Sequence, residues 1–137
     1  MASRIFVDAS AYVALARQDD ENHRAAKAII TTLQQQRARL YTTYFAAAEA
    51  HALLLRYLGI APAYRYLQGL DTSQVTTVVH AAPADIETAK ALLYRYDDKD
   101  FSLADAIAFA VMTRLGLKQA FTFDRHFGQY GWEVLKA

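Results

Sequence analysis

Short runs of consecutive apolar residues alternate along this chain with longer segments in which apolar residues recur every three or four positions. The short runs predict buried strands, because a continuous β-prone run suits a sheet that is covered on both faces. The longer segments predict helices with one apolar face. The predicted strands span residues 4–8, 39–43, 74–80, 119–123 and 132–135, and the predicted helices span residues 11–17, 22–36, 44–58, 83–96 and 102–115, with a shorter helix after Pro62 and a short helical turn after Asp124.

Residues at the predicted helix ends support these boundaries. Asn22 and Ser102 each precede an apolar-periodic segment and have side chains that can cap a helix N-terminus. Thr42 or Thr43 can do the same for the long middle helix. Gly116 follows the last predicted long helix, in the position that glycine commonly takes after a helix C-terminus.

Strands that alternate with helices predict a parallel sheet joined by right-handed crossovers. The predicted fold class is α/β, a three-layer α/β/α sandwich with a mainly parallel central sheet of four to five strands. The sequence shows no internal repeat and no linker rich in proline or glycine, so we expect residues 1–137 to form a single domain. In sheets of this kind, functional sites form beyond the carboxyl ends of the strands.

The composition narrows the possible chemistry. The 137 residues are 54% hydrophobic and 21% charged, which is typical of a globular protein. The absence of cysteine excludes disulfides, thiolate zinc sites and cysteine nucleophiles. The N-terminal apolar run is too short for a signal peptide and no tract is long enough for a bilayer span, so we expect a cytoplasmic protein with no membrane partner.

The net charge of +1 gives no overall field that would indicate a nucleic-acid partner. If several acids gather in one pocket, however, the rest of the surface is more basic than this total suggests. Basic residues such as Arg114 and Arg125 could then line an approach to the pocket. Scattered solubilising charge explains the composition equally well.

Four carboxylates from distant parts of the chain are predicted to meet at one edge of the sheet. Asp8 and Asp124 follow the first and fourth predicted strands, whose carboxyl ends share an edge. From Asp105 a helix of about 15 Å runs away from that edge and a strand of about 17 Å returns, so Asp105 and Asp124 finish close together. Glu49 lies in the second turn of the helix that follows the second strand.

Carboxylates crowded in this way repel one another, and proton sharing, basic partners or a divalent cation can relieve the repulsion. A cluster of oxygen ligands without cysteine is what Mg²⁺ or Mn²⁺ prefers. Structural roles compete with this interpretation, because Asp8 and Asp124 can each cap a helix and Asp105 lies at capping-box spacing from Ser102. Glu49 is harder to explain in this way, since it sits in an apolar segment with no Lys or Arg within one turn, and only Arg56, two turns on, could pair with it.

Other polar residues near these acids are candidates for supporting roles. Ser10 lies two residues after Asp8, so its hydroxyl can hold that carboxylate or a water. Asp100 is the candidate secondary contributor from an acidic loop, and Arg125 and His126 lie next to Asp124, where they can contact a phosphate. The histidines show no paired metal-ligand spacing, so the sequence assigns no metal-ligand role to them.

With these residues placed, the sequence resembles the PIN-domain family and, within it, the small VapC-type toxins of prokaryotic toxin–antitoxin pairs. The segments that carry the resemblance are "FVDASAYVAL", "TTYFAAAEAHALL", "DKDFSLADAIAFAVM" and "AFTFDRHFGQYGWEVL". The resemblance implies a metal-dependent endoribonuclease with one or two Mg²⁺ or Mn²⁺ ions. The implied catalytic and metal-binding residues are Asp8, Glu49, Asp105 and Asp124. Ala104 is a departure, because many relatives have a hydroxyl residue directly before the third acid.

The resemblance also implies an RNA substrate, a small antitoxin as protein partner, and a homodimer. A catalytically silent PIN-like module that binds RNA or protein is the main alternative, although it predicts a spoiled pocket and all four acids are present. A phosphatase of the haloacid dehalogenase type needs a second Asp where Ser10 stands. A phospho-receiver needs a lysine near its last strands, which the segment "TFD" does not supply.

Overall fold

The computed structural model describes residues 2–137, so Met1 lies outside the described residues. Strands and helices alternate as predicted, and two helices follow each of the first three strands. In chain order the elements are β1 (Arg4–Val7), α1 (Ala9–Ala16), α2 (His23–Gln35), β2 (Arg39–Thr43), α3 (Tyr44–Leu58), α4 (Ile60–Thr72), β3 (Thr76–Val79), α5 (Pro83–Arg95), α6 (Leu103–Leu115), β4 (Gln119–Phe121), α7 (Arg125–Tyr130) and β5 (Glu133–Val134).

The five strands form one sheet in the order β3-β2-β1-β4-β5, and all neighbouring pairs are parallel. The first strand therefore lies at the centre, between β2 and β4. Val7, the last residue of β1, pairs with Phe121, the last residue of β4. Their carboxyl ends thus lie at the same height, which brings the residues that follow them to one edge.

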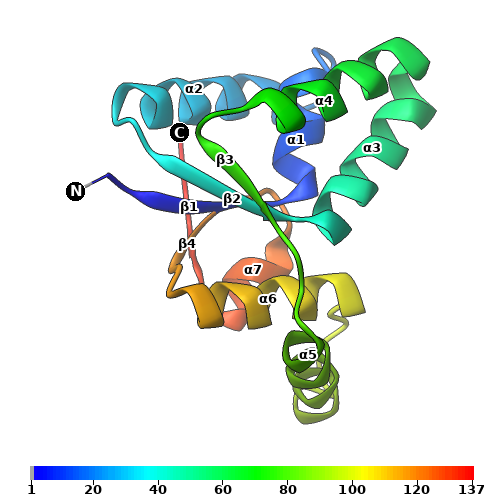
Figure 1. Cartoon of the computed structure of the whole chain (residues 1–137), viewed down its shortest axis with the longest axis vertical. Helices are drawn as coiled ribbons and strands as arrows, with labels where there is room; N and C mark the ends of the chain where they lie inside the picture. Colours follow the sequence, from blue (N-terminus) through cyan, green and yellow to red (C-terminus); the bar gives the residue numbers. More distant parts are fainter. Residues whose placement is uncertain (1) are drawn as a thin grey trace.

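Helices cover both faces of the sheet, which confirms the predicted α/β/α sandwich. Ile5 and Val7 point to one face and pack in a buried cluster with residues of α1 and α2, among them Ala14 and Ile29. Phe6 points to the opposite face, as the two-residue side-chain period of a strand requires, and packs with residues of α6 and α7. Figure 1 shows these two layers, with α1 and α2 on one side of the sheet and α6 and α7 on the other.

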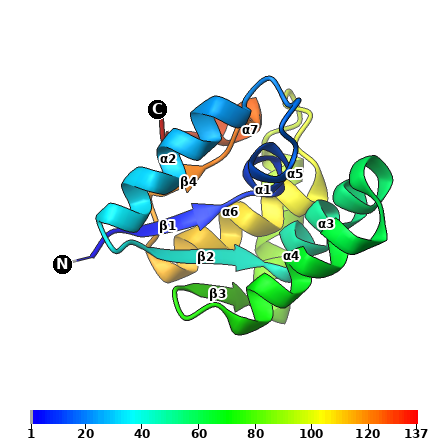
Figure 2. The same cartoon turned by 90° about the horizontal axis from the view of Figure 1, so that it is seen from above.

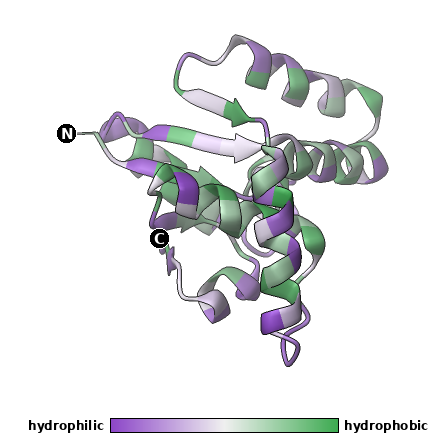
Figure 3. Ribbon diagram, turned by 60° about the horizontal axis from the view of Figure 1, so that its bottom comes forward, coloured by the Kyte–Doolittle hydropathy of each residue, from purple (hydrophilic) through white to green (hydrophobic). Residues whose placement is uncertain are grey.

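Helix α3 extends from the carboxyl end of β2, and α4 packs against it and returns toward the start of β3 (Figure 2). Gly59 joins them with a φ of 95°, a left-handed conformation that glycine adopts without steric cost. Hydrophobic segments also run along this helix pair (Figure 3). The large apolar side chains exposed on α3 and α4 are Tyr44, Phe45, Leu55, Tyr57, Leu58, Ile60, Tyr64 and Leu67.

Aromatic rings anchor the short helix α7 to the rest of the fold. Phe127 is fully buried, and its ring centroid lies 5.9 Å from that of Phe6 in β1 and 5.0 Å from that of Phe109 in α6. Aromatic pairs at these separations add to the free energy gained by burial alone. The packing of Phe127 fixes the start of α7, where Asp124 and His126 are located.

Several predicted boundaries are wrong for local reasons. The first helix begins at Ala9, because Asp8 caps it directly. Helix α4 begins at Ile60 and includes Pro62 in its first turn, where a missing N–H breaks no helical hydrogen bond. Strand β4 ends at Phe121 and not at residue 123, since the Asp124 N–H donates to the Thr122 hydroxyl.

Two capping predictions have opposite outcomes. Asn22 makes no side-chain capping bond, and its backbone N–H donates to the Asp20 carboxylate. Thr43 does cap α3, since its hydroxyl accepts a hydrogen bond from the Ala46 N–H at 3.1 Å. Among residues 2–137, no helix is long and apolar enough to cross a bilayer.

Candidate functional site

Asp8 is the most buried acid of the site, with a relative exposure of 7%. It follows β1 and caps α1, and only its Oδ2 atom carries the local hydrogen bonds. That oxygen accepts from the Ser10 N–H at 3.3 Å, the Ser10 hydroxyl at 2.7 Å and the Thr122 hydroxyl at 3.0 Å. Burial raises the pKa of Asp8 above its ordinary value, against the effect of these hydrogen bonds, and the charge of Asp124 raises it further.

Ser10 and Thr122 tie Asp8 to the segment that carries Asp124. The Ser10 hydroxyl accepts from the Phe123 N–H at 2.9 Å, and the Thr122 hydroxyl accepts from the Asp124 N–H at 3.0 Å. The two hydroxyls lie 3.2 Å apart. The sequence analysis gave Ser10 a supporting role but overlooked Thr122, although a hydroxyl residue at the end of an apolar strand was a usable signal.

Asp105 and Asp124 both fulfil the structural roles considered for them. Asp105 forms a capping box with Ser102, in which its Oδ2 accepts from the Ser102 N–H at 3.1 Å and its own N–H donates to the Ser102 hydroxyl at 3.0 Å. Asp124 caps α7, since its Oδ1 accepts from the His126 N–H at 2.9 Å. Each cap uses one carboxylate oxygen only, so these structural roles do not exclude a functional one.

His126 lies among three of the acids, which the sequence analysis did not foresee. Its Nδ1 is 2.9 Å from Asp105 Oδ2 and 3.1 Å from Asp124 Oδ1, and its Nε2 is 2.9 Å from Asp100 Oδ1. Ionised carboxylates only accept hydrogen bonds, so both ring nitrogens must carry a proton to satisfy these contacts. The signal in the sequence was the two-residue step from Asp124, which places both side chains at the same helix end.

The charges around His126 shift its pKa and that of Asp100. Burial acts to lower the pKa of His126, but the hydrogen bond to Asp100 and the charges of Asp124, Asp105 and Asp100 together raise it. The same hydrogen bond is the main cause that lowers the pKa of Asp100. Arg125 also contacts Asp100 at 3.3 Å, but both side chains are largely exposed, so this ion pair contributes little to stability.

Glu49 projects from the second turn of α3 without any hydrogen bond or ion pair among residues 2–137. Partial burial raises its pKa, and the charges of Asp8, Asp105 and Asp124 raise it further. Glu49 therefore lies within electrostatic reach of all three other acids. The four carboxylates named from the sequence gather on one side of the molecule, although their roles stay a prediction.

The ligand atoms do not all lie equally close. Oxygens of Asp105 and Asp124 and a nitrogen of His126 lie within 4.8 Å of one another, and Asp8 and Glu49 stand outside this tight group. Each acid also keeps oxygen unused: within residues 2–137 no hydrogen bond reaches Asp8 Oδ1, Asp105 Oδ1, Asp124 Oδ2 or either oxygen of Glu49. Unused carboxylate oxygens are the ligands that a hard divalent cation prefers. A cation among them would also offset the repulsion that helps to raise the pKa values of Asp8 and Glu49.

Arg114 does not line this site, contrary to the sequence-based suggestion. It contacts the buried carboxylate of Asp85 in a two-pronged arrangement, through Nε at 2.9 Å and through one terminal nitrogen at 2.8 Å. This pair joins α6 to the start of α5, where Asp85 also accepts from the Ala82 N–H at 2.7 Å. The Arg114 hydrogen bonds are the main cause that lowers the pKa of Asp85.

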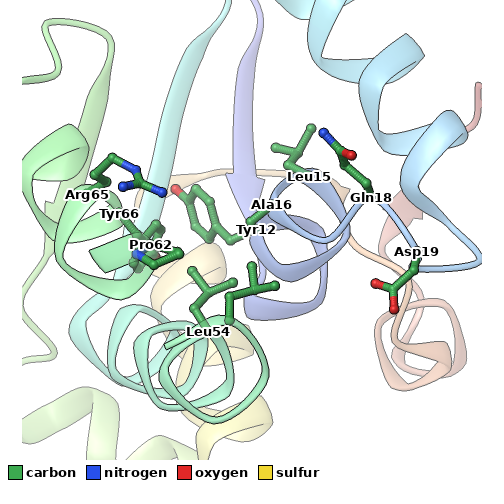
Figure 4. Close-up of a pocket in the computed structure, with 10 residues that line it drawn as sticks. Tyr12, Leu15, Ala16, Gln18, Asp19, Leu54, Pro62, Arg65 and Tyr66 are labelled. Carbon is green, nitrogen blue, oxygen red and sulfur yellow. The ribbon is translucent and has the colours of Figure 1, made fainter. Parts of the chain in front are cut away.

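A separate hollow of about 790 Å³ lies between α1, α3 and α4 and includes none of the four acids. Figure 4 labels Tyr12 and Tyr66 among the residues that line it, and their rings meet edge-on with centroids 4.9 Å apart. Both hydroxyls are buried without a hydrogen-bond partner among residues 2–137. The hollow is lined by Tyr12, Leu15, Ala16, Gln18, Asp19, Leu54, Leu58, Pro62, Arg65 and Tyr66.

Comparisons with known proteins indicate the family of this chain. Residues 5–133 match the family model of the PIN domain. Over 128 residues, the chain is 31% identical to a protein named 23S rRNA-specific endonuclease VapC20 from Mycobacterium tuberculosis, and the match covers 93% of this chain and 95% of the relative.

Solved structures give the same result. The crystal structure of M. tuberculosis VapC20, described as a Sarcin-Ricin loop cleaving toxin, superposes with a TM-score of 0.89 at 29% identity, covering 97% of this chain and 99% of that one. FitAcB from Neisseria gonorrhoeae superposes with a TM-score of 0.68 at 15% identity, covering 96% of each chain, which supports the fold alone.

Proposed function

The chain belongs to the PIN-domain family, and from this premise we propose that it is a metal-dependent endoribonuclease, the toxin of a type II toxin–antitoxin pair, with residues 1–137 forming one nuclease domain. The observation that carries the proposal is the set of unused carboxylate oxygens. Asp8, Asp105 and Asp124 each satisfy local structure with one oxygen and keep the other free. Purely structural caps would not need to gather on one side of the molecule.

We assign the metal-binding role to Asp8, Asp105 and Asp124. Glu49 serves either as a further metal ligand or as a proton acceptor. Bound Mg²⁺ or Mn²⁺ supplies the acidity that activates a water and the positive charge that stabilises the phosphoryl oxygens. The residues fit such an ion, because Asp8, Asp105 and Asp124 offer carboxylate oxygens, the ligand atoms that hard divalent cations prefer. Which ion binds, and how many ions bind, are questions for the experiment below.

The side chains of the protein have distinct tasks in this mechanism. Ser10 and Thr122 hold Oδ2 of Asp8, so that its other oxygen keeps a fixed direction. Glu49 has a raised pKa and no hydrogen-bond partner in the described part of the chain, residues 2–137, which suits a carboxylate that accepts a proton from the attacking water. Arg125 is largely exposed beside Asp100 and can contact an RNA phosphate at the rim of the site.

The proposed substrate is RNA. The M. tuberculosis relative is named as a 23S rRNA-specific endonuclease, so 23S rRNA and its sarcin–ricin loop are the first RNAs to test. Because this RNA occurs in the cytoplasm, we propose that the protein acts there. The catalytically silent alternative gains no support from the site, since every acid that it predicts to be lost is present.

The proposed protein partner is a small antitoxin, and the proposed assembly is a homodimer. The exposed apolar residues of α3 and α4, including Leu58 and Ile60, support a protein partner, because apolar patches of this kind mark interaction surfaces. Light scattering of the purified protein tests the homodimer, and a monomer at micromolar concentration would reject it. Co-purification with a co-expressed antitoxin tests the partner.

The nuclease proposal is tested with purified protein and total cellular RNA, with added Mg²⁺, Mn²⁺ or a chelator. We expect endonucleolytic products only when a divalent ion is present, and primer extension then locates the cut. The Asp8→Asn variant should lose cleavage, whereas the matched variant Asp71→Asn, which changes an exposed Asp on α4, should keep it. Cleavage that persists in Asp8→Asn, or in excess chelator, would reject the assignment.

A further inference from the structure

The imidazole of His126 holds two carboxylates that come from different helices. Its Nδ1 lies between Asp105 Oδ2, at 2.9 Å, and Asp124 Oδ1, at 3.1 Å. Asp105 belongs to α6 and Asp124 caps α7, so no single element fixes their separation. Oxygens of the two carboxylates lie within 4.8 Å of each other and repel, and the imidazole N–H that bonds to Asp105 and lies close to Asp124 offsets that repulsion.

The same contacts determine which oxygens remain free. His126 Nδ1 makes a hydrogen bond to Asp105 Oδ2 and an ion-pair contact with Asp124 Oδ1, and these oxygens already accept a backbone N–H in each cap. Each carboxylate is therefore held through one oxygen, and rotation about its terminal bond would break two hydrogen bonds at Asp105, and one hydrogen bond and an ion-pair contact at Asp124. Asp105 Oδ1 and Asp124 Oδ2 are left in defined directions.

The opposite side of the ring makes a different contact. Nε2 lies 2.9 Å from Asp100 Oδ1, in the polar loop before α6, and this carboxylate is largely exposed. Phe101 packs edge-on against the imidazole with a centroid distance of 5.5 Å. The ring thus has one nitrogen turned toward the acids of the site and the other toward the surface.

We propose that His126 is a positioning residue whose Nδ1–H orients Asp105 and Asp124 for binding of the divalent cation, whereas its Nε2 contact with Asp100 is secondary. The inference rests on the proposed metal-dependent function and concerns the same site. Hydrogen bonds that orient metal ligands commonly change metal affinity by about 10- to 100-fold when removed.

Three substitutions separate the two nitrogens. Asn in place of His126 keeps an N–H donor near the Nδ1 position and loses the Nε2 contact. Gln in place of His126 keeps a donor near the Nε2 position and loses the Nδ1 contact, and His126→Phe retains only a ring against Phe101. His80→Gln is the matched control, because His80 is exposed, packs against Tyr44 and contacts none of the acids.

Mn²⁺ affinity is measured by electron paramagnetic resonance of the free ion, with circular dichroism to verify the fold of each variant. We expect His126→Gln and His126→Phe to weaken Mn²⁺ binding by about tenfold or more, and His126→Asn and His80→Gln to stay within about threefold of the original protein. The proposal is overturned if His126→Gln binds Mn²⁺ as tightly as the original protein. It is also overturned if His126→Asn loses as much affinity as His126→Phe.

RNA cleavage by the same preparations distinguishes this proposal from the proposed function. If the original protein cleaves RNA but His126→Gln keeps full Mn²⁺ affinity, the positioning role fails and the nuclease assignment stands. If the affinities follow the expected order but no preparation cleaves RNA, the nuclease assignment fails and the positioning role stands.

Discussion

Replacing Asp8 with Asn should stabilise the metal-free protein while removing its response to metal. The carboxylate of Asp8 is buried, and only its Oδ2 carries hydrogen bonds, from Ser10 and Thr122. The amide oxygen of Asn can accept the same hydrogen bonds, so the cap of α1 survives. The substitution removes a negative charge that is disfavoured both by burial and by the nearby charge of Asp124.

The expected gain is about 1 kcal/mol at neutral pH, within the range found when unfavourable charges are removed. For a protein of this size, that gain raises the melting temperature by roughly 3 to 5 °C. Because the pKa of Asp8 is raised in the folded state, its destabilising effect is full above that pKa and absent below the ordinary carboxylate value. The advantage of Asp8→Asn should therefore shrink as the pH falls through the raised pKa.

Metal should reverse the order of stability. A ligand present at 100 times its dissociation constant stabilises the folded state by about 2.7 kcal/mol. The original protein should gain this amount with Mn²⁺, whereas Asp8→Asn should gain far less, because one of the proposed ligands is neutral. The original protein then becomes the more stable of the two.

Urea denaturation followed by circular dichroism, with and without Mn²⁺, measures both effects. Asp71→Asn serves as the control and should behave like the original protein in each condition. The reasoning is refuted if Asp8→Asn is less stable than the original protein without metal, or if both proteins gain the same stability from Mn²⁺.

Three further substitutions test other parts of the structure. Thr122→Val should weaken Mn²⁺ binding by about tenfold, since it removes one of the three hydrogen bonds that hold Asp8 Oδ2, and unchanged affinity would argue against that support. Asp85→Asn should lower the free energy of unfolding by about 2 kcal/mol at pH 7, less than for a fully buried pair because Arg114 is 43% exposed. Since the pKa of Asp85 is lowered in the folded state, the stability that its charge contributes is present above the ordinary carboxylate pKa and is lost as the pH falls through the lowered value. Urea titrations at pH 7 measure the difference, and equal stability of the two proteins there would contradict the prediction. Phe127→Ala should cost about 3 to 4 kcal/mol in the same assay, because the ring is fully buried, and a loss below about 1 kcal/mol would mean that α7 is held by other contacts.

The architecture could be predicted from the sequence because the period of the apolar residues differs between strands and helices. Ile5, Phe6 and Val7 form a continuous apolar run and become the central strand, covered on both faces. Local hydrogen bonds shift the boundaries of some helices and strands away from the predicted residues. Asp8 starts a helix two residues early, because its Oδ2 accepts the Ser10 N–H.

The gathering of the acids followed from strand direction, but their partners did not. Parallel strands with matched carboxyl ends place Asp8 near the segment that carries Asp124, and this needs no knowledge of side-chain contacts. The positions of Thr122 and His126 depend on rotamers and on packing across the sheet, which leave no periodic signal in the sequence. Arg114 was misjudged for the same reason, since its partner Asp85 lies 29 residues away.

The distribution of the acids along the chain affects how readily mutations inactivate the encoded protein. The four carboxylates extend from residue 8 to residue 124, and the buried Thr122 hydroxyl joins Asp8 to the last of them. Every premature stop or frameshift before codon 124 therefore yields a polypeptide without a complete set of acids. For a cell under pressure to escape such a nuclease, nearly the whole reading frame is a target for inactivating lesions.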